Sequence, residues 1–218
     1  ESSPHASWKE LLQHLEQAYE FDRVVYLSNY LTPHTDTMGD IELLRSVFRA
    51  CMGRRVQLLY VAGPAGAEGA ADVPGRTGKG IIAHAANDLC LYYAAHKGVQ
   101  AKILRVPFLY TASPALEDPF LAPLFDACLT GSVALQGAED AAFPLLCAEE
   151  LSVLVRRIFD SWNGNFETLD VADTFHHTAG EVGEALKALF PHLAVAYGDS
   201  AGYALPASDV ARMRYGWV

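Results

Sequence analysis

The sequence alternates between short, almost continuously apolar segments and longer segments in which apolar residues recur at helical spacing. Residues 23–27 and 56–62 are apolar segments of this short kind, and we predict that each is a strand buried on both faces. Between them lies a predicted amphipathic helix whose apolar residues are Ile41, Leu44, Val47, Phe48 and Cys51. Strands separated by helices predict an α/β fold with a parallel sheet.

The same alternation continues to the end of the chain and becomes less regular after about residue 112. We expect one domain over residues 1–218, with a sheet core in 1–111 and, in 112–218, the remaining core strands and a small C-terminal lobe. Residues 63–80 are rich in Gly, Ala and Pro and predict a long loop. The remaining expected helices are 7–20, 81–96, 119–129, 148–162 and 178–189, and the remaining extended segments are 101–106, 135, 143–146, 166–169 and 193–197.

Charge and cysteine content exclude several classes of function. Lys and Arg number 16 against 26 Asp and Glu, a net charge of −10 that argues against binding to the phosphates of a nucleic acid. No apolar segment reaches the roughly 18 residues of a membrane span, and no signal peptide is recognisable, so we expect a cytoplasmic protein without a membrane span. The four cysteines form no Cys-x-x-Cys pair and predict buried, reduced thiols.

Six segments, in the right order, resemble the extended short-chain dehydrogenase/reductase family, in particular its NAD-dependent sugar-nucleotide epimerases and dehydratases. The segments are FDRVVYL (21–27), VQLLYVA (56–62), NDLCLYYAAHKGV (87–99), KILRVPFLY (102–110), AEEL (148–151) and SDVARMRYGW (208–217). The resemblance implies an incomplete Rossmann-like parallel sheet flanked by helices, with a small C-terminal lobe. In that family, segments 21–27 and 56–62 would be the fourth and fifth strands, so the chain resembles a degenerate, N-terminally truncated member.

The resemblance also indicates where the family's functional groups would lie, and most of these positions carry other residues. The family's Tyr-x-x-x-Lys pair falls on Lys79 and Ala83, and its hydroxyl after the fifth strand falls within 62–65, which reads Ala-Gly-Pro-Ala. The family asparagine falls on Phe108, and the arginine that clamps a diphosphate falls near Phe143. Of these side chains only Lys79 can exchange a proton, so we expect no catalytic residue and no enzymatic activity.

The dinucleotide fingerprint of the family would also be missing. It is a glycine-rich turn after the first strand, and the first matched segment here is already the fourth strand. The remaining glycine-rich stretch, residues 75–80, follows a loop and departs from the P-loop pattern at Val73 and Gly80. We therefore expect no bound NAD and no other cofactor.

Other groups of polar residues also argue against a chemical site. Adjacent His176 and His177, even with Asp173 nearby, diverge too far to hold one metal ion, so we expect no metal. Glu149 and Glu150 are adjacent, and their side chains therefore do not converge for acid–base work. The Arg pairs at 54–55 and 156–157 are either solvated or in contact with an anionic partner. The aromatic residues form either core or a ligand pocket; they are at 92–93, 108, 110, 120 and 125.

Two hypotheses of function follow. The first is a non-catalytic, epimerase-like domain that acts as a regulatory, sensory or protein-interaction module within a larger protein and binds an unknown small molecule or a partner domain. The alternative is a fragment of an NAD-dependent sugar-nucleotide epimerase or dehydratase. The pair Lys79 and Ala83 favours the first hypothesis, because an upstream truncation would not alter this position.

The resemblance further implies a homodimer built from two helices of each subunit. Helices 41–52 and 81–97 would pack against the same pair of a partner chain, as in the family's four-helix bundle. The expected interface residues, taken as exposed apolar side chains, are Val47, Ile82, Ala86, Leu89 and Tyr93.

Strand 24–27 would become an edge of the sheet if the family's first strands are absent. An apolar edge strand invites aggregation unless something covers it. The candidate covers are helix 7–20, loop 63–80 and the same edge of a second subunit. With that edge covered, a ligand would bind between the carboxyl ends of the strands and residues 112–147.

Overall fold

The computed structural model describes eight stretches of the chain, which form two compact units. The described stretches are 21–27, 37–63, 78–111, 121–135, 137–143, 145–171, 177–199 and 210–216. The first unit comprises Glu1–Ala65, Val73–Leu104 and Trp162–Leu169, and the second comprises Gly66–Asp72, Arg105–Ser161 and Asp170–Val218. The division therefore falls a few residues before the boundary expected at 111, and a later segment returns to the first unit.

A four-stranded sheet of order β1-β2-β3-β7 contains the most buried strands of the molecule. The strands are β1 (Arg23–Leu27), β2 (Gln57–Ala62), β3 (Gln100–Arg105) and β7 (Phe166–Asp170). β1 and β2 are parallel, and the backbone hydrogen bonds from Ala101 N to Asn165 O and from Val171 N to Arg105 O show that β3 and β7 advance in the same direction. The predicted parallel α/β fold is confirmed.

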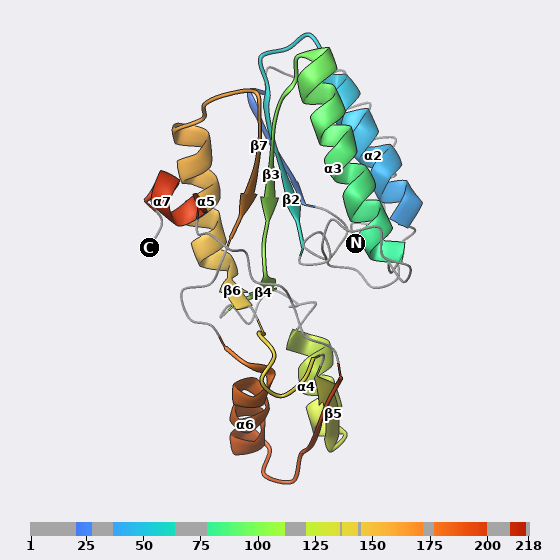
Figure 1. Ribbon diagram of the computed structural model, residues 1–218, viewed down its shortest axis with the longest axis vertical. Helices are drawn as coiled ribbons and strands as arrows, with labels where there is room; N and C mark the ends of the chain where they lie inside the picture. The colour runs from blue at the N-terminus through green and yellow to red at the C-terminus, as the bar shows by residue number, and fades with distance from the viewer. Residues whose placement is uncertain are drawn as a thin grey trace, which may run out of the picture. The chain divides into compact units, whose positions relative to one another are not determined.

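Helices α2 (Thr37–Cys51) and α3 (Gly78–Lys97) lie side by side against one face of this sheet (Figure 1). The residues that alternate along β2 and β3 toward these helices are Leu58, Tyr60, Ala101 and Ile103, which belong to the core of the first unit. The Phe48 and Tyr93 rings stack between the two helices with centroids 4.6 Å apart. This packing explains why the helical spacing was readable from the sequence.

β1 is tied to helix α2 through one buried polar contact. The Tyr26 hydroxyl donates a hydrogen bond to the Asp40 carboxylate, and both residues are buried. Burial, assisted by the neighbouring Asp40 carboxylate, raises the pKa of Tyr26 far above its ordinary value. The hydroxyl therefore stays protonated and remains the donor of this contact.

β1 forms one edge of the sheet among the strands that the structure describes, as predicted. Its side chains alternate: Tyr26 is buried, whereas Val25 and Leu27 are 43% and 56% exposed. Two of the predicted covers, 7–20 and most of 63–80, lie outside the described residues. Coverage of this edge by a second subunit stays a prediction.

The second unit contains a small lobe around two parallel strands. β5 (Ser132–Leu135) pairs with β8 (Ala194–Tyr197), and helices α4 (Leu121–Leu129) and α6 (Ala179–Leu189) pack with them around a core that includes Cys128, Val133, Leu135 and Leu186. Thr178 begins α6 with a capping box that also involves Glu181.

The rest of the second unit includes two elements that the sequence did not predict. β4 (Phe108–Tyr110) pairs in parallel with β6 (Leu145–Cys147), and α7 (Val210–Tyr215) packs near α5 (Ala148–Asp160). The Arg157 guanidinium on α5 donates to the Tyr215 and Gly216 carbonyls at the end of α7. Within the described ranges, no helix is both long and apolar enough to span a membrane.

Candidate functional site

The end of β2 and the start of helix α3 are where the resemblance would place proton-transfer groups. Ala62 and Gly63 are buried at the end of β2 and carry no exchangeable proton in their side chains. Lys79 and Ala83 lie one turn apart in α3, the relation that a Tyr-x-x-x-Lys pair requires. The second of these positions is Ala83, so the lysine that the resemblance would place there is replaced by a methyl group.

The predicted diphosphate-binding position is occupied by a core residue. Phe143 is 3% exposed and belongs to the core of the small lobe, together with Val133 and Leu135. Phe108 begins the short strand β4. An aromatic side chain buried in a lobe cannot replace a guanidinium that binds two phosphate groups.

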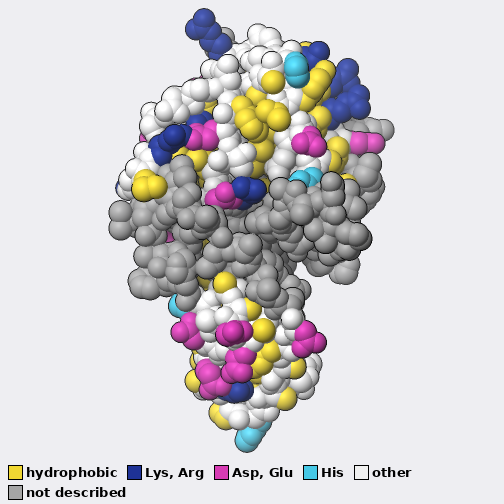
Figure 2. All heavy atoms as spheres, viewed as in Figure 1, with side chains coloured by type: hydrophobic (Ala, Val, Ile, Leu, Met, Phe, Trp, Pro, Cys, Tyr) yellow, Lys and Arg dark blue, Asp and Glu magenta, His cyan; other side chains and the backbone are white. Residues whose placement is uncertain are grey.

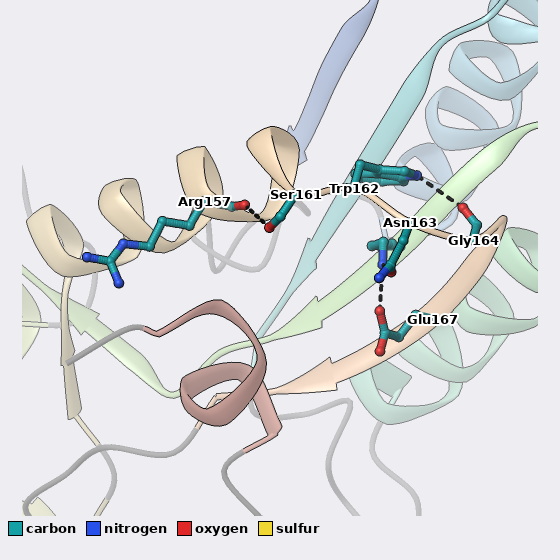
Figure 3. Close-up of polar contacts among 7 residues, drawn as sticks. Arg157, Ser161, Trp162, Asn163, Gly164 and Glu167 are labelled. Carbon is teal, nitrogen blue, oxygen red and sulfur yellow. Dashed lines mark hydrogen bonds and ion pairs between the residues drawn. The ribbon is translucent and has the colours of Figure 1, made fainter.

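The most unusual polar residue of the first unit is Lys102, which no motif had singled out. Its side chain is fully buried on β3, and its Nζ lies 2.5 Å from Glu167 Oε2 on β7 and 3.5 Å from Asn163 Oδ1. The Trp162 ring lies over the ammonium group with its centroid 5.2 Å from Nζ. Figure 3 shows the side chains of Asn163 and Glu167 pointing toward one another, and the Trp162 indole pointing toward the Gly164 carbonyl, to which it donates.

This arrangement satisfies a buried charge. A buried ammonium is tolerated only when it is paired and hydrogen-bonded, and here a carboxylate, an amide oxygen and an aromatic face meet that need. Because Lys102 has no exposed surface, it cannot bind a substrate from solution. We therefore assign the cluster to the folding of β3 against β7 and its preceding loop.

A second ion pair joins the opposite ends of the same two strands. Arg105 Nη2 lies 2.6 Å from Asp170 Oδ2, and the two side chains are 28% and 30% exposed. This pair lies at the carboxyl ends of the strands, the end at which open α/β sheets bind ligands. The Arg105 Nε atom is buried and has no hydrogen-bond partner among the described residues, but its guanidinium is otherwise engaged by Asp170.

Of the adjacent Glu149 and Glu150 at the start of α5, Glu149 makes side-chain hydrogen bonds with other described residues. It accepts hydrogen bonds from Cys147 Sγ at 2.8 Å and from Thr111 Oγ1 at 3.0 Å. The Cys147 hydrogen bond, then the Glu149 backbone and the Thr111 hydroxyl lower the pKa of Glu149, so the carboxylate is held ionised. An ionised carboxylate with two donors is an acceptor and not a general acid, and Glu150 does not share this contact.

The expected interface residues are placed differently from the prediction. Val47, Ala86 and Tyr93 are buried in the core of the first unit, so their assignment to an exposed face is wrong. Helix α3 is apolar on more than one side, and the sheet and α2 cover the side on which Ala86 and Tyr93 lie. Ile82 and Leu89 are partly buried. The large apolar side chains that α3 exposes are instead Leu91 and Tyr92, at 47% and 46%.

The remaining sequence candidates are not brought together into a chemical site. His177 is exposed and lies 3.7 Å from Glu181 at the start of α6, while Asp173 and His176 lie outside the described residues. No three metal-ligating side chains converge in the part of the chain that the structure describes. The Tyr92 and Tyr93 rings meet edge to face with centroids 5.5 Å apart, Tyr92 being exposed and Tyr93 in the core.

Comparison with solved structures decides the fold. UDP-N-acetylglucosamine 4-epimerase from Bacillus cereus superposes with a TM-score of 0.67 at 16% identity, over 99% of this chain and 76% of the epimerase. The fold is that of the sugar-nucleotide epimerases and reductases. MoeE5, solved with UDP-glucuronic acid and NAD, gives 0.69 at 16% identity, over 95% of this chain and 76% of MoeE5.

A reductase is also similar to this chain in fold. The GDP-mannoheptose C4 reductase from Campylobacter jejuni, solved with NADP bound, matches with a TM-score of 0.69 at 10% identity, over 97% of this chain and 80% of the reductase. No protein-family model matches the sequence, and no curated protein matches it. The resemblance inferred from six sequence segments is thus confirmed at the level of the fold.

Proposed function

We propose that this chain is a non-catalytic domain of the epimerase fold, which serves as a regulatory or protein-interaction module within a larger protein. The observation that carries the proposal is Ala83 on helix α3, one turn after Lys79. Oxidation or reduction of a sugar hydroxyl requires a group that takes up or supplies a proton at that hydroxyl. A methyl group stands where the family has its lysine, so no ammonium group at that position would assist this proton transfer.

The positions around it support the same conclusion. Ala62 and Gly63 end strand β2 without a hydroxyl, and Phe143 fills the lobe core where the resemblance places a phosphate-binding arginine. These positions lie in different elements, so a single misplaced segment does not account for all of them. The domain retains the scaffold of its structural neighbours without the groups that would act on a substrate.

A surface on helix α3 suits the proposed interaction role, and we propose that it forms a homodimer interface. Leu91 and Tyr92 are exposed large apolar residues on consecutive positions of α3, and Met52 is exposed just after α2. The variant Leu91→Glu/Tyr92→Glu should be a monomer by light scattering, while wild type should be a dimer. A monomeric wild type at roughly 100 μM contradicts the dimer, since a biological dimer of micromolar affinity is filled at that concentration.

The compartment that we propose is the cytoplasm. Cys51, Cys90, Cys128 and Cys147 are all free in the structure. Free buried thiols are typical of proteins from reducing compartments.

A second candidate is a fragment of an NAD-dependent sugar-nucleotide enzyme. It is favoured by the solved neighbours, two of which were determined with UDP-glucuronic acid and NAD and a third with NADP bound. The two candidates differ in one measurable respect, because only the second requires turnover by some form of the protein.

Turnover assays test the proposal. The chain is incubated with NAD or NADP and with UDP-glucose or UDP-glucuronic acid, and reduced cofactor is followed by absorbance while sugars are separated chromatographically. We expect no product above the buffer blank for wild type or for Ala83→Lys, which restores only one of the missing groups. Product formation by wild type would overturn the proposal and establish the second candidate.

A further inference from the structure

The loops before the four parallel strands of the first unit form one edge of its sheet, here called the amino-terminal edge. It consists of residues 21–23, 52–57, 97–100 and 162–166. The hydrogen bonds from Gln57 N to Asp22 O and from Ala101 N to Asn165 O hold these loops together in the order of the strands. Helices α2 and α3 also end here, as Figure 1 shows.

Exposed cations gather on this edge although the whole chain carries a net charge of −10. Arg54, Arg55 and Lys97 of the edge are exposed, as is Arg49 at the adjoining end of α2, and no carboxylate pairs with any of them among the described residues. Asp22 is the exposed carboxylate of the same edge. Figure 2 shows Lys and Arg side chains gathered over the end at which α2 and α3 finish.

Helix dipoles account for only part of this charge. Arg49 lies in the last turn of α2 and Lys97 in the last turn of α3, where a cation offsets the partial negative charge of the helix end. Arg54 and Arg55 lie beyond α2, after the Gly53 turn, and are not needed for that purpose. Two arginines therefore remain in excess of what the helices use.

Aromatic rings hold part of the cationic edge in place. The Arg54 guanidinium lies over the Phe21 ring at 5.4 Å, and the Lys97 ammonium lies over the Tyr92 ring at 5.6 Å. A cation that stacks on a ring keeps its charge and loses part of its conformational freedom before a partner arrives. Arg54 and Lys97 thus present positioned positive charge that no carboxylate of the described residues neutralises.

We propose that the amino-terminal edge binds an acidic peptide segment of a partner protein. A short acidic segment interacts with the local cations, because the charge of distant acidic residues is screened beyond about 8 Å at physiological salt. A long nucleic acid or an anionic membrane would also meet the acidic remainder of the chain, which disfavours those partners. The inference rests on the proposed interaction function and names the chemistry of its partner.

The test uses the full chain and a fluorescein-labelled decaglutamate peptide, with binding followed by fluorescence anisotropy. We expect saturable binding at 50 mM NaCl that weakens about tenfold at 300 mM. The variant Arg54→Glu/Arg55→Glu should bind about tenfold more weakly or not at all. The variant Arg54→Lys/Arg55→Lys should retain binding, because the charge is conserved.

A matched control changes the charge equally elsewhere. Arg156→Glu/Lys187→Glu reverses two exposed cations of the second unit, so it should bind the peptide like wild type. If the double arginine variant does not fold, Arg55→Glu alone serves, because Arg55 makes no stacking contact among the described residues.

Three results would overturn the proposal. They are no binding below millimolar peptide, an equal loss in the Arg156→Glu/Lys187→Glu control, and tighter binding of a double-stranded oligonucleotide or of phosphatidylserine vesicles than of the peptide. None of these results depends on turnover with NAD, so failure here is distinguishable from failure of the proposed function.

Discussion

Strands β3 and β7 are joined by two ion pairs of similar length in very different surroundings. Near the amino ends, Lys102 and Glu167 lie 2.5 Å apart with side-chain exposures of 0% and 18%, beneath the Trp162 ring. Three residues further along each strand, Arg105 and Asp170 lie 2.6 Å apart with exposures of 28% and 30%. The first pair is largely shielded from water, whereas both side chains of the second are partly exposed to it.

The contribution of an ion pair to stability depends on its surroundings more than on the distance between its charged atoms. Breaking a buried pair leaves one charge without water and without its partner. Breaking an exposed pair returns both groups to water at little cost. The first pair therefore serves the fold, and the second lies at the carboxyl ends of the strands, where open α/β sheets bind ligands.

The largest effect is expected from Lys102→Met. Removing the ammonium leaves the Glu167 carboxylate unpaired in a mostly buried position, and we expect a loss of about 3 kcal/mol in the free energy of unfolding. Urea denaturation followed by circular dichroism measures it. The variant Lys102→Met/Glu167→Leu should recover most of the loss, because it buries no charge.

A loss below about 1 kcal/mol in Lys102→Met would contradict the difference between the two pairs, because exposed pairs contribute no more than that. The same urea denaturation experiments measure this loss. They require that the unfolding free energy of the double variant fall with urea concentration at the same slope as that of wild type.

Burial of the Cys51 thiol, at the end of α2, should make the free energy of unfolding depend on pH. Burial raises the pKa of this thiol from 9.0 to about 11, against the lowering effect of Arg54. In the unfolded chain the thiol loses its proton from about pH 9, whereas the folded chain keeps it, so stability falls as pH rises from about 9 to about 11. The loss due to this group should be about 2–3 kcal/mol.

The contribution of Cys51 is isolated by comparing wild type with Cys51→Ala at pH 8 and pH 11 by urea denaturation. Tyr26, whose pKa is also raised, weakens both proteins equally at the higher pH. An identical pH dependence of the two proteins would show that the thiol is hydrated in the folded state, contrary to this account.

Most of the sheet could be predicted because its strands are short apolar segments of standard length. β2 and β3 were predicted to within one residue at their starts, and β1 was predicted in full. β4 was missed because three residues after a proline carry too little periodicity, and α7 because its six residues make fewer than two turns.

The polar clusters were less predictable, because their partners are remote in sequence. Lys102 stands in an apolar strand, which signals a buried charge, but its partner Glu167 is 65 positions away. The burial of Val47, Ala86 and Tyr93 could not be deduced either, since a helix with apolar residues on several sides does not indicate which side meets its own sheet. Both the partner of Lys102 and the burial of these helix residues became known only from the three-dimensional packing.

The smallest effect is expected from Arg105→Met at the open end of the same strands. Asp170 is 30% exposed and keeps contact with water when Arg105 is replaced, so we expect a change below about 1 kcal/mol in the free energy of unfolding. The measurement is again urea denaturation, alongside Lys102→Met. A change as large as that of Lys102→Met would mean that the two ends of the sheet are equally closed.

Isothermal titration of the chain with NAD, NADH, NADP and NADPH tests the central claim most directly. The chain has the epimerase fold, and we propose that it lacks the pair that would transfer a proton. We expect no dinucleotide binding tighter than about millimolar, some 4 kcal/mol weaker than micromolar binding. The same titrations of a folded, active sugar-nucleotide epimerase provide the positive control. Saturable micromolar binding of any of the four dinucleotides to this chain would contradict the account.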